Sequence, residues 1–205
     1  FAQMHARKFG ISTSSGTAAL QIAVQALKEL EGWKDGDEIL VPATTFIATS
    51  NVVLHNNLKP VFVDVDSKTY NIDPRKIEEK ITRRTRAIMP VNLFGLSAEM
   101  SKIMKIAKKH GLRVIEDSCE AAGVKYLARP VGSMGDIGCF STYIAHLVTT
   151  GVGGVILTND SNIAVKARSL VNHGRDSIYL AIDDDWGKRG KKLREIVSKR
   201  FSFVS

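Results

Sequence analysis

Short apolar strand patterns alternate with amphipathic helical patterns along most of the chain, and this alternation restricts the possible folds most strongly. The clearest helix is expected over 17–30, where one face carries only Ala, Ile and Leu. Strands separated by helices of this length are typical of parallel sheets, so we expect an α/β fold with a mostly parallel sheet and helices on both faces. The expected strands are 38–41, 60–65, 87–91, 113–116, 137–141 and 154–158, and the expected helices are 17–30, 46–55, 73–81, 97–110 and 160–172.

Composition excludes several other classes of protein. Of the 205 residues, 44% are apolar and 24% are charged, which is typical of soluble globular proteins. No apolar run approaches the roughly 20 residues of a membrane span, and Cys119 and Cys139 form no CxxC motif. We therefore expect reduced thiols in a cytoplasmic protein, with no metal site and no membrane partner. Because the chain starts at Phe1, we also expect it to be part of a longer protein.

The net charge of +8 is concentrated near the end of the chain. Residues 186–200 contain seven Lys or Arg and one Glu, a balance of +6. Such a segment can bind nucleic acid, but it has no interleaved aromatic or Gly-rich pattern, so a solvated loop and helix face is favoured. A basic loop beside an anionic substrate is a third interpretation.

Four segments place unusual residues at helix starts or strand ends, where α/β sheets bind ligands. In 14–17, small residues at a helix start suit an anion, although this segment taken alone favours a plain helix cap. In 42–46, Phe46 can stack on a planar ring or pack in the core. In 114–121, two acids end an apolar strand, and one can pair with a buried cation or cap a helix. In 135–154, closely spaced glycines suggest close approach of backbone to ligand.

In their order along the chain, these segments resemble one family, the sugar aminotransferase-like proteins of the DegT/DnrJ/StrS type. The resemblance implies the fold type I architecture of aspartate aminotransferase and the cofactors pyridoxal 5′-phosphate (PLP) and pyridoxamine 5′-phosphate (PMP). It also implies a nucleotide-linked keto sugar substrate, an amino donor such as glutamate, a homodimer and a role in polysaccharide or antibiotic sugar synthesis. The matching segments are 15–20, 36–38, 42–49, 60–65, 116–117, 132–136, 140–141 and 172–174.

The same resemblance divides the chain and assigns the phosphate site. It places a large PLP-binding domain at 1–175. Residues 176–205 would be a basic loop and the start of the connection to a smaller C-terminal domain, which lies beyond this sequence. The cofactor phosphate would be held by Gly16 and Thr17, next to Ser15, with help from the Ser141 hydroxyl.

Three further residues are assigned to the cofactor ring. Phe46 would stack on the pyridine. Asp117 would pair with the ring nitrogen and keep it protonated, so that the ring accepts electrons from a carbanion. Glu120 stands where the aminotransferases usually have Gln near the ring hydroxyl, and this departure leaves its role open.

The largest departure is His146, at the position of the Schiff-base lysine of the sugar aminotransferases. Histidine forms no stable imine, but it carries protons well near neutral pH. The same exchange marks the PLP-dependent sugar 3-dehydratases of the family, in which histidine acts as the base and the 3-hydroxyl leaves. We therefore expect a PLP/PMP-dependent, 3-dehydratase-like enzyme for a nucleotide-linked 4-keto-deoxy sugar, with His146 and Asp117 as catalytic residues. The alternatives are aminotransferase chemistry and a non-catalytic relative that binds PLP or a sugar nucleotide.

One dehydratase branch also binds an iron–sulfur cluster, and the chain departs from its pattern. Cys119 matches one cluster ligand, but Ser177, Ile178 and Tyr179 follow the Gly-Arg-Asp stretch. A single thiol cannot hold a cluster that normally needs four, so we expect Cys119 to be a small buried side chain. Val152 is a further departure, because the family commonly has Glu before the paired glycines.

Overall fold

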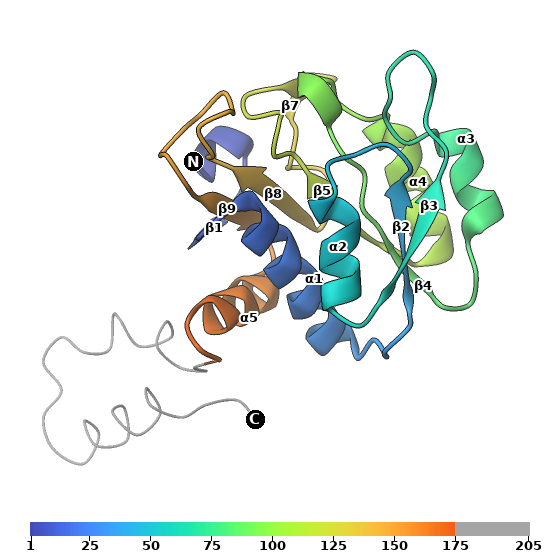
Figure 1. Ribbon diagram of the computed structural model, residues 1–205, viewed down its shortest axis with the longest axis horizontal. Helices are drawn as coiled ribbons and strands as arrows, with labels where there is room; N and C mark the ends of the chain where they lie inside the picture. Colours follow the sequence, from blue (N-terminus) through green and yellow to red (C-terminus); the bar gives the residue numbers. More distant parts are fainter. Residues whose placement is uncertain (175–205) are drawn as a thin grey trace, which may run out of the picture.

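The computed structural model describes residues 1–174, and a seven-stranded sheet runs through them (Figure 1). The strand order is β1-β9-β8-β5-β4-β2-β3. From β3 to β8 all neighbours are parallel, whereas β9 is antiparallel to both β8 and β1. The mostly parallel sheet is therefore confirmed. The strands are β1 (Phe9–Thr13), β2 (Glu38–Pro42), β3 (Lys59–Val63), β4 (Thr85–Ile88), β5 (Arg113–Asp117), β8 (Ile137–Ser141) and β9 (Gly154–Thr158).

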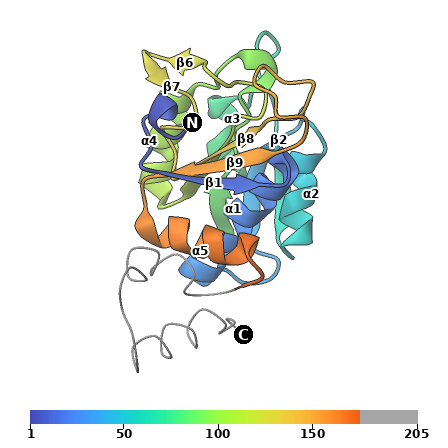
Figure 2. The same cartoon turned by 90° about the vertical axis from the view of Figure 1, so that its left-hand side faces the viewer.

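Helices cover both faces of the sheet, as expected (Figures 1 and 2). On one face pack α1 (Gly16–Glu31), α2 (Ala48–His55) and α5 (Ser161–Val171), and on the other pack α3 (Pro74–Ile77) and α4 (Met100–His110). Side chains alternate along β2, so Ile39 and Val41 belong to the first core and Leu40 to the second. Burial on both faces explains why this strand reads as a continuous apolar run.

Several boundaries differ from the prediction, and some short elements were not expected. The helix expected at 73–81 is α3 followed by a 3₁₀ turn, η2 (Glu78–Lys80), and the helix expected from residue 97 begins at Met100. The unexpected elements include β1, in which only Ile11 is buried, so its apolar pattern is weak. The others are the 3₁₀ turns η1 (Gln3–His5) and η3 (Leu93–Gly95) and the hairpin of β6 (Lys125–Tyr126) and β7 (Arg129–Pro130).

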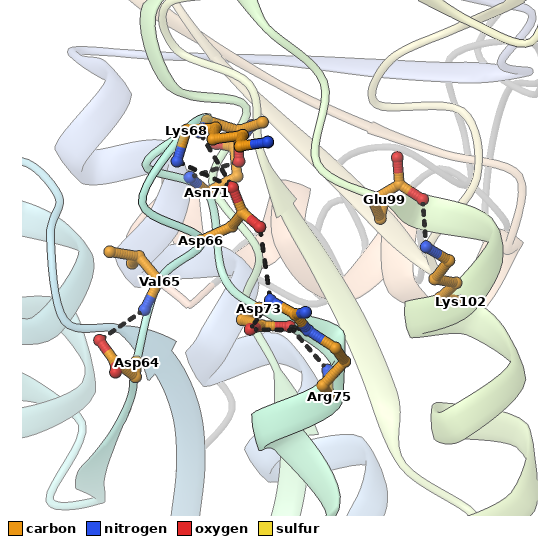
Figure 3. Close-up of polar contacts among 10 residues, drawn as sticks. Asp64, Val65, Asp66, Lys68, Asn71, Asp73, Arg75, Glu99 and Lys102 are labelled. Carbon is orange, nitrogen blue, oxygen red and sulfur yellow. Dashed lines mark hydrogen bonds and ion pairs between the residues drawn. The ribbon is translucent and has the colours of Figure 1, made fainter.

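The loop between β3 and α3 is held by its own acidic side chains (Figure 3). Asp66 Oδ1 accepts a 2.9 Å hydrogen bond from the Lys68 N–H, and Asp73 pairs with Arg75 at 2.8 Å. Asp73 also caps α3 by accepting from the Arg75 N–H. These contacts fix the backbone on both sides of Asn71, a buried residue that holds the loop after β4.

No helix within residues 1–174 is long and apolar enough to cross a membrane. The basic segment predicted at 186–200 and the predicted division after residue 175 lie outside the described residues.

Candidate active site

A cavity of about 390 Å³ opens where the parallel strands β5 and β8 end, a size typical of small-molecule sites. All eight residues that the sequence assigned to the site line this one cavity. They are Ser15, Gly16, Thr17, Phe46, Asp117, Glu120, Ser141 and His146. The structure thus brings together residues from the four separate segments that the sequence analysis singled out.

The N-terminus of α1 forms one end of the cavity. Ser15 is the helix cap, and its Oγ accepts a 3.1 Å hydrogen bond from the Ala18 N–H. The Ser15 carbonyl accepts from Ala19, which leaves the N–H groups of Gly16 and Thr17 to meet a ligand. The helix dipole makes this end attractive to an anion.

Gly16 packs directly against the end of β8. A Cβ on Gly16 would lie 2.7 Å from the Ser141 Cβ and 2.9 Å from the Cys119 Sγ, so only glycine fits there. The Ser141 Oγ accepts from the Tyr143 N–H at 3.2 Å, and its own hydrogen can still be donated. The helix N-terminus and one serine hydroxyl therefore converge on the same corner of the cavity.

Asp117 is a buried carboxylate that borders the cavity, with 5% of its surface exposed. Thr49 Oγ1 donates to its Oδ2 at 2.9 Å, and the Cys119 N–H donates to its Oδ1 at 3.3 Å. Among the described residues Asp117 forms no ion pair, and burial raises the pKa of its carboxyl group. A buried acid without a cation is costly, and a cationic ligand in the cavity would remove that cost.

Thr49 is one residue of this site that the sequence interpretation did not assign to it. It is fully buried and also lies 2.8 Å from Thr45 Oγ1, which lines the cavity. The two threonines are four residues apart, so they lie on the same side of the chain as it enters α2. That spacing was visible in the sequence, but nothing nearby in the sequence indicated the partner, Asp117.

Glu116, the other acid at this strand end, has a structural role. Residues alternate along β5, so its side chain points to the opposite face from Asp117. It is fully buried and accepts hydrogen bonds of 2.6 to 2.7 Å from the N–H groups of Gly132, Met134 and Gly135. It therefore holds the loop before β8.

His146 lies in the loop after β8, and its N–H donates to the Tyr143 carbonyl at 2.9 Å. The two rings approach edge to face, with 6.2 Å between centroids, and both residues line the cavity. An imidazole here can exchange a proton with a ligand bound between it and Asp117.

Phe46 and Glu120 lie at other parts of the cavity wall. Phe46 is 68% exposed and so is not a core residue. Glu120 Oε2 accepts a 2.8 Å hydrogen bond from the Phe94 N–H. One oxygen of this acid therefore holds a backbone segment, a contact that the sequence did not suggest.

Several glycines of 135–154 allow two backbone segments to pack closely against each other, contrary to the expectation that they approach a ligand. A Cβ on Gly138 would lie within 3 Å of the Gly132 backbone, and one on Gly154 would meet the Ser15 carbonyl. Gly153, by contrast, does line the cavity.

The side chains present fit a phosphorylated, cationic ring. The free N–H groups of α1 and the Ser141 hydroxyl suit a phosphate, and the unpaired carboxylate of Asp117 suits a protonated ring nitrogen. Within the described residues, no three His, Cys, Asp or Glu side chains gather closely enough to hold a metal ion. Burial raises the pKa of the Cys119 thiol well above its ordinary value, so this cysteine stays protonated.

Residues 1–194 match the DegT/DnrJ/EryC1/StrS aminotransferase family. The chain belongs to this family. It is 47% identical over 171 residues to a UDP-N-acetyl-3-dehydro-α-D-glucosamine 3-aminotransferase of Acidithiobacillus ferrooxidans, covering 83% of this chain and 45% of that protein.

Solved structures of relatives show the same fold. A His-to-Asn variant of GDP-4-keto-6-deoxymannose-3-dehydratase with bound GDP-perosamine superposes with a TM-score of 0.88 and 30% identity, over all of this chain and 53% of that one. NtdA from Bacillus subtilis with bound PMP gives a TM-score of 0.77 and 36% identity, over 85% of this chain and 40% of that one. The fold type I architecture is therefore confirmed, and PLP and its amine form PMP are the cofactors of this family. The chain spans about half the length of these relatives.

Proposed function

We propose that this chain forms the cofactor-binding part of a PLP- or PMP-dependent enzyme that acts on a nucleotide-linked 4-keto-deoxy sugar. We further propose a 3-dehydratase-like reaction in which His146 is the base. The observation that carries the proposal is that His146 shares one cavity with Asp117, Gly16 and Ser141, while no lysine is among the described residues that line it.

The residues of the cavity would divide the work of binding. Gly16, Thr17 and Ser141 would hold the phosphate, and Phe46 would cover one face of the ring. The carboxylate of Asp117, fixed by Thr49, would hold a proton on the ring nitrogen. When bound, the cofactor supplies an electron sink that stabilises a carbanion.

His146 would move the proton. A side chain that lacks a primary amine cannot form a stable imine with the cofactor aldehyde, so the imidazole stays free to act as a base. Its backbone bond to Tyr143 restrains the loop, which favours a fixed position of the ring beside the ligand.

The exposed apolar residues around the cavity support a homodimer. Ile144 and Leu147 in the loop after β8 are 69% and 73% exposed, and Ile47 beside Phe46 is 61% exposed. Exposed apolar surface of this kind marks an interaction site, and closed two-fold dimers are the commonest assembly. We propose that a second copy covers this surface and that the dimer works in the cytoplasm.

Aminotransfer from a donor such as glutamate is the second candidate, because the relative with 47% identity is named an aminotransferase. Mass spectrometry separates the two. The full-length protein is incubated with PLP, glutamate and GDP- or UDP-linked 4-keto sugars. Loss of the 3-hydroxyl supports the dehydratase, replacement of the keto oxygen by an amine supports the aminotransferase, and an unchanged substrate supports a non-catalytic binding protein.

A further inference from the structure

Phe94 combines an exposed aromatic side chain with an uncommon backbone conformation. It is 74% exposed and has φ 54° and ψ 29°, in the left-handed region that bulky residues rarely adopt. Such strain persists where the surrounding structure imposes it, and it gathers at ligand sites.

Side chains from two other segments impose this conformation. Asn71 Oδ1 accepts a 3.1 Å hydrogen bond from the Leu93 N–H, and Asn71 Nδ2 donates to the Leu96 carbonyl at 3.0 Å. Between these two points, Glu120 Oε2 accepts from the Phe94 N–H at 2.8 Å. The backbone on both sides of the aromatic ring is thus fixed.

The residue before this turn attaches it to the strand that carries Asp117. The Asn92 N–H donates to the Asp117 carbonyl and its Nδ2 donates to Ser118 Oγ, both at 2.8 Å. Asn92 Oδ1 accepts from the Ala98 N–H at 2.9 Å. Phe94 is therefore held at a fixed position relative to Asp117, which lines the cavity.

Phe94 does not line the cavity itself, but its chain neighbour Leu93 and its hydrogen-bond partner Glu120 do, so its backbone lies beside the wall, at what we call the rim. A substrate whose sugar reaches His146 and Asp117 must extend its nucleotide outward past the rim. We propose that Phe94 is a substrate-binding residue whose ring stacks on the nucleobase of that substrate. Aromatic side chains stack on every base, and a fixed backbone lowers the entropy lost on binding. This inference rests on the proposed function.

The test measures binding of UDP, GDP and thymidine diphosphate to the full-length, PLP-loaded protein by calorimetry, with inorganic pyrophosphate as a probe that lacks a base. Phe94→Ala should weaken binding of the nucleoside diphosphates by roughly tenfold or more. It should leave binding of pyrophosphate unchanged, and Phe94→Trp should retain the affinity. Leu127→Ala is the matched control, because Leu127 is also exposed and left-handed (φ 47°) but lies at the β6–β7 turn, where neither of its chain neighbours lines the cavity.

Three outcomes would overturn the inference. Equal nucleotide affinity of wild type and Phe94→Ala removes the stacking role and leaves the proposed function standing. If light scattering shows that the dimer of Phe94→Ala separates into monomers while its nucleotide affinity is unchanged, the ring belongs to a subunit interface instead. A wild-type protein that binds none of the nucleoside diphosphates refutes the nucleotide-linked substrate itself and this inference with it.

Discussion

The Thr49 hydroxyl donates a 2.9 Å hydrogen bond to Oδ2 of Asp117, and both residues are buried, with Asp117 lining the cavity. A threonine hydroxyl turned toward a carboxylate supports the ionised form of the acid. Burial opposes this by removing the carboxylate from water and raises the pKa of Asp117, and no described cation pairs with it. The free site thus holds an acid whose charge is only partly stabilised until a cation binds.

Replacing Thr49 by Val should weaken that support. A hydrogen bond to a charged group contributes about 1.5–3 kcal/mol, so turnover should fall about 10- to 100-fold. Thr49→Ser keeps the hydroxyl and serves as the control, with turnover close to that of wild type. The turnover numbers of both variants are measured by steady-state kinetics. Equal turnover of Thr49→Val and wild type would contradict the role assigned to Thr49.

Asp117→Asn should separate stability from activity. Because burial raises the pKa of Asp117 in the folded state, the folded protein binds a proton more tightly than the unfolded chain does. This acid therefore costs stability as pH rises above about 4. The cofactor-free variant should melt at a higher temperature than wild type at pH 8, while turnover falls at least about 100-fold and cofactor affinity changes much less. A melting temperature below that of wild type at pH 8 would count against this description of Asp117.

The main elements of the fold were predictable because local pattern and final burial agree. Strands β8 and β9 have the predicted limits, and each is a short apolar run bounded by polar or glycine residues. Helix α3 ends early because Ile77 is its only buried side chain, and one contact cannot sustain a longer helix. The start of α4 is displaced by a distant partner, since Asn92 binds the Ala98 N–H and holds the preceding residues outside the helix.

The site was predictable where its residues follow strands or begin a helix. Gly16, Asp117 and Ser141 all lie at such positions, and the sheet brings them together. Contacts between distant segments were not predictable. Thr49 is 68 residues from its partner, and Glu120 binds the backbone of Phe94, so neither bond leaves a local signal in the sequence.

Gly16→Ala should impair both folding and phosphate binding. The new methyl group would lie within 3 Å of the Ser141 Cβ and the Cys119 Sγ, and such overpacking typically costs about 1–3 kcal/mol. We expect a lower melting temperature and weaker PLP binding, measured by fluorescence titration. Gly10→Ala on β1 is the matched control. Its new Cβ would lie 3.3 Å from its nearest neighbour, the Ala2 Cβ, so the crowding is milder than at Gly16. If both variants bind PLP like wild type, the close packing at Gly16 has no role in binding.

His5 should make the protein sensitive to acid. It is fully buried against Phe1 and Phe140, and its Nε2 has no hydrogen-bond partner within residues 1–174. Burial lowers the pKa of His5, so the unfolded chain binds the proton more tightly and stability is lost as pH falls below about 6.5. His5→Phe should reduce this loss in urea unfolding at pH 7.5 and 5.5. The exposed His55→Gln should unfold like wild type, and an unchanged pH dependence in His5→Phe would contradict the prediction.

His146 provides the sharpest test of the proposed chemistry. His146→Asn keeps part of the size and polarity of the side chain but removes the base, which should lower turnover about 10²- to 10⁴-fold. PLP binding should change little, because Gly16, Thr17 and Ser141 remain. In wild type, borohydride should fix no PLP on residues 140–150, since no described cavity residue is a lysine.

His146→Lys should reverse the borohydride result expected for the wild type, because it restores a lysine that can bond to PLP. The new amine can bond to the aldehyde of PLP, so borohydride should now label residue 146, and the absorbance of the bound cofactor should shift. Dehydration should stop because the base is lost and the aldehyde is occupied, and any gain of amino-transfer activity would show that position 146 selects between the two reactions. Full activity of His146→Asn on the true substrate would instead make this histidine a bystander and require another base in the part of the enzyme that completes the site.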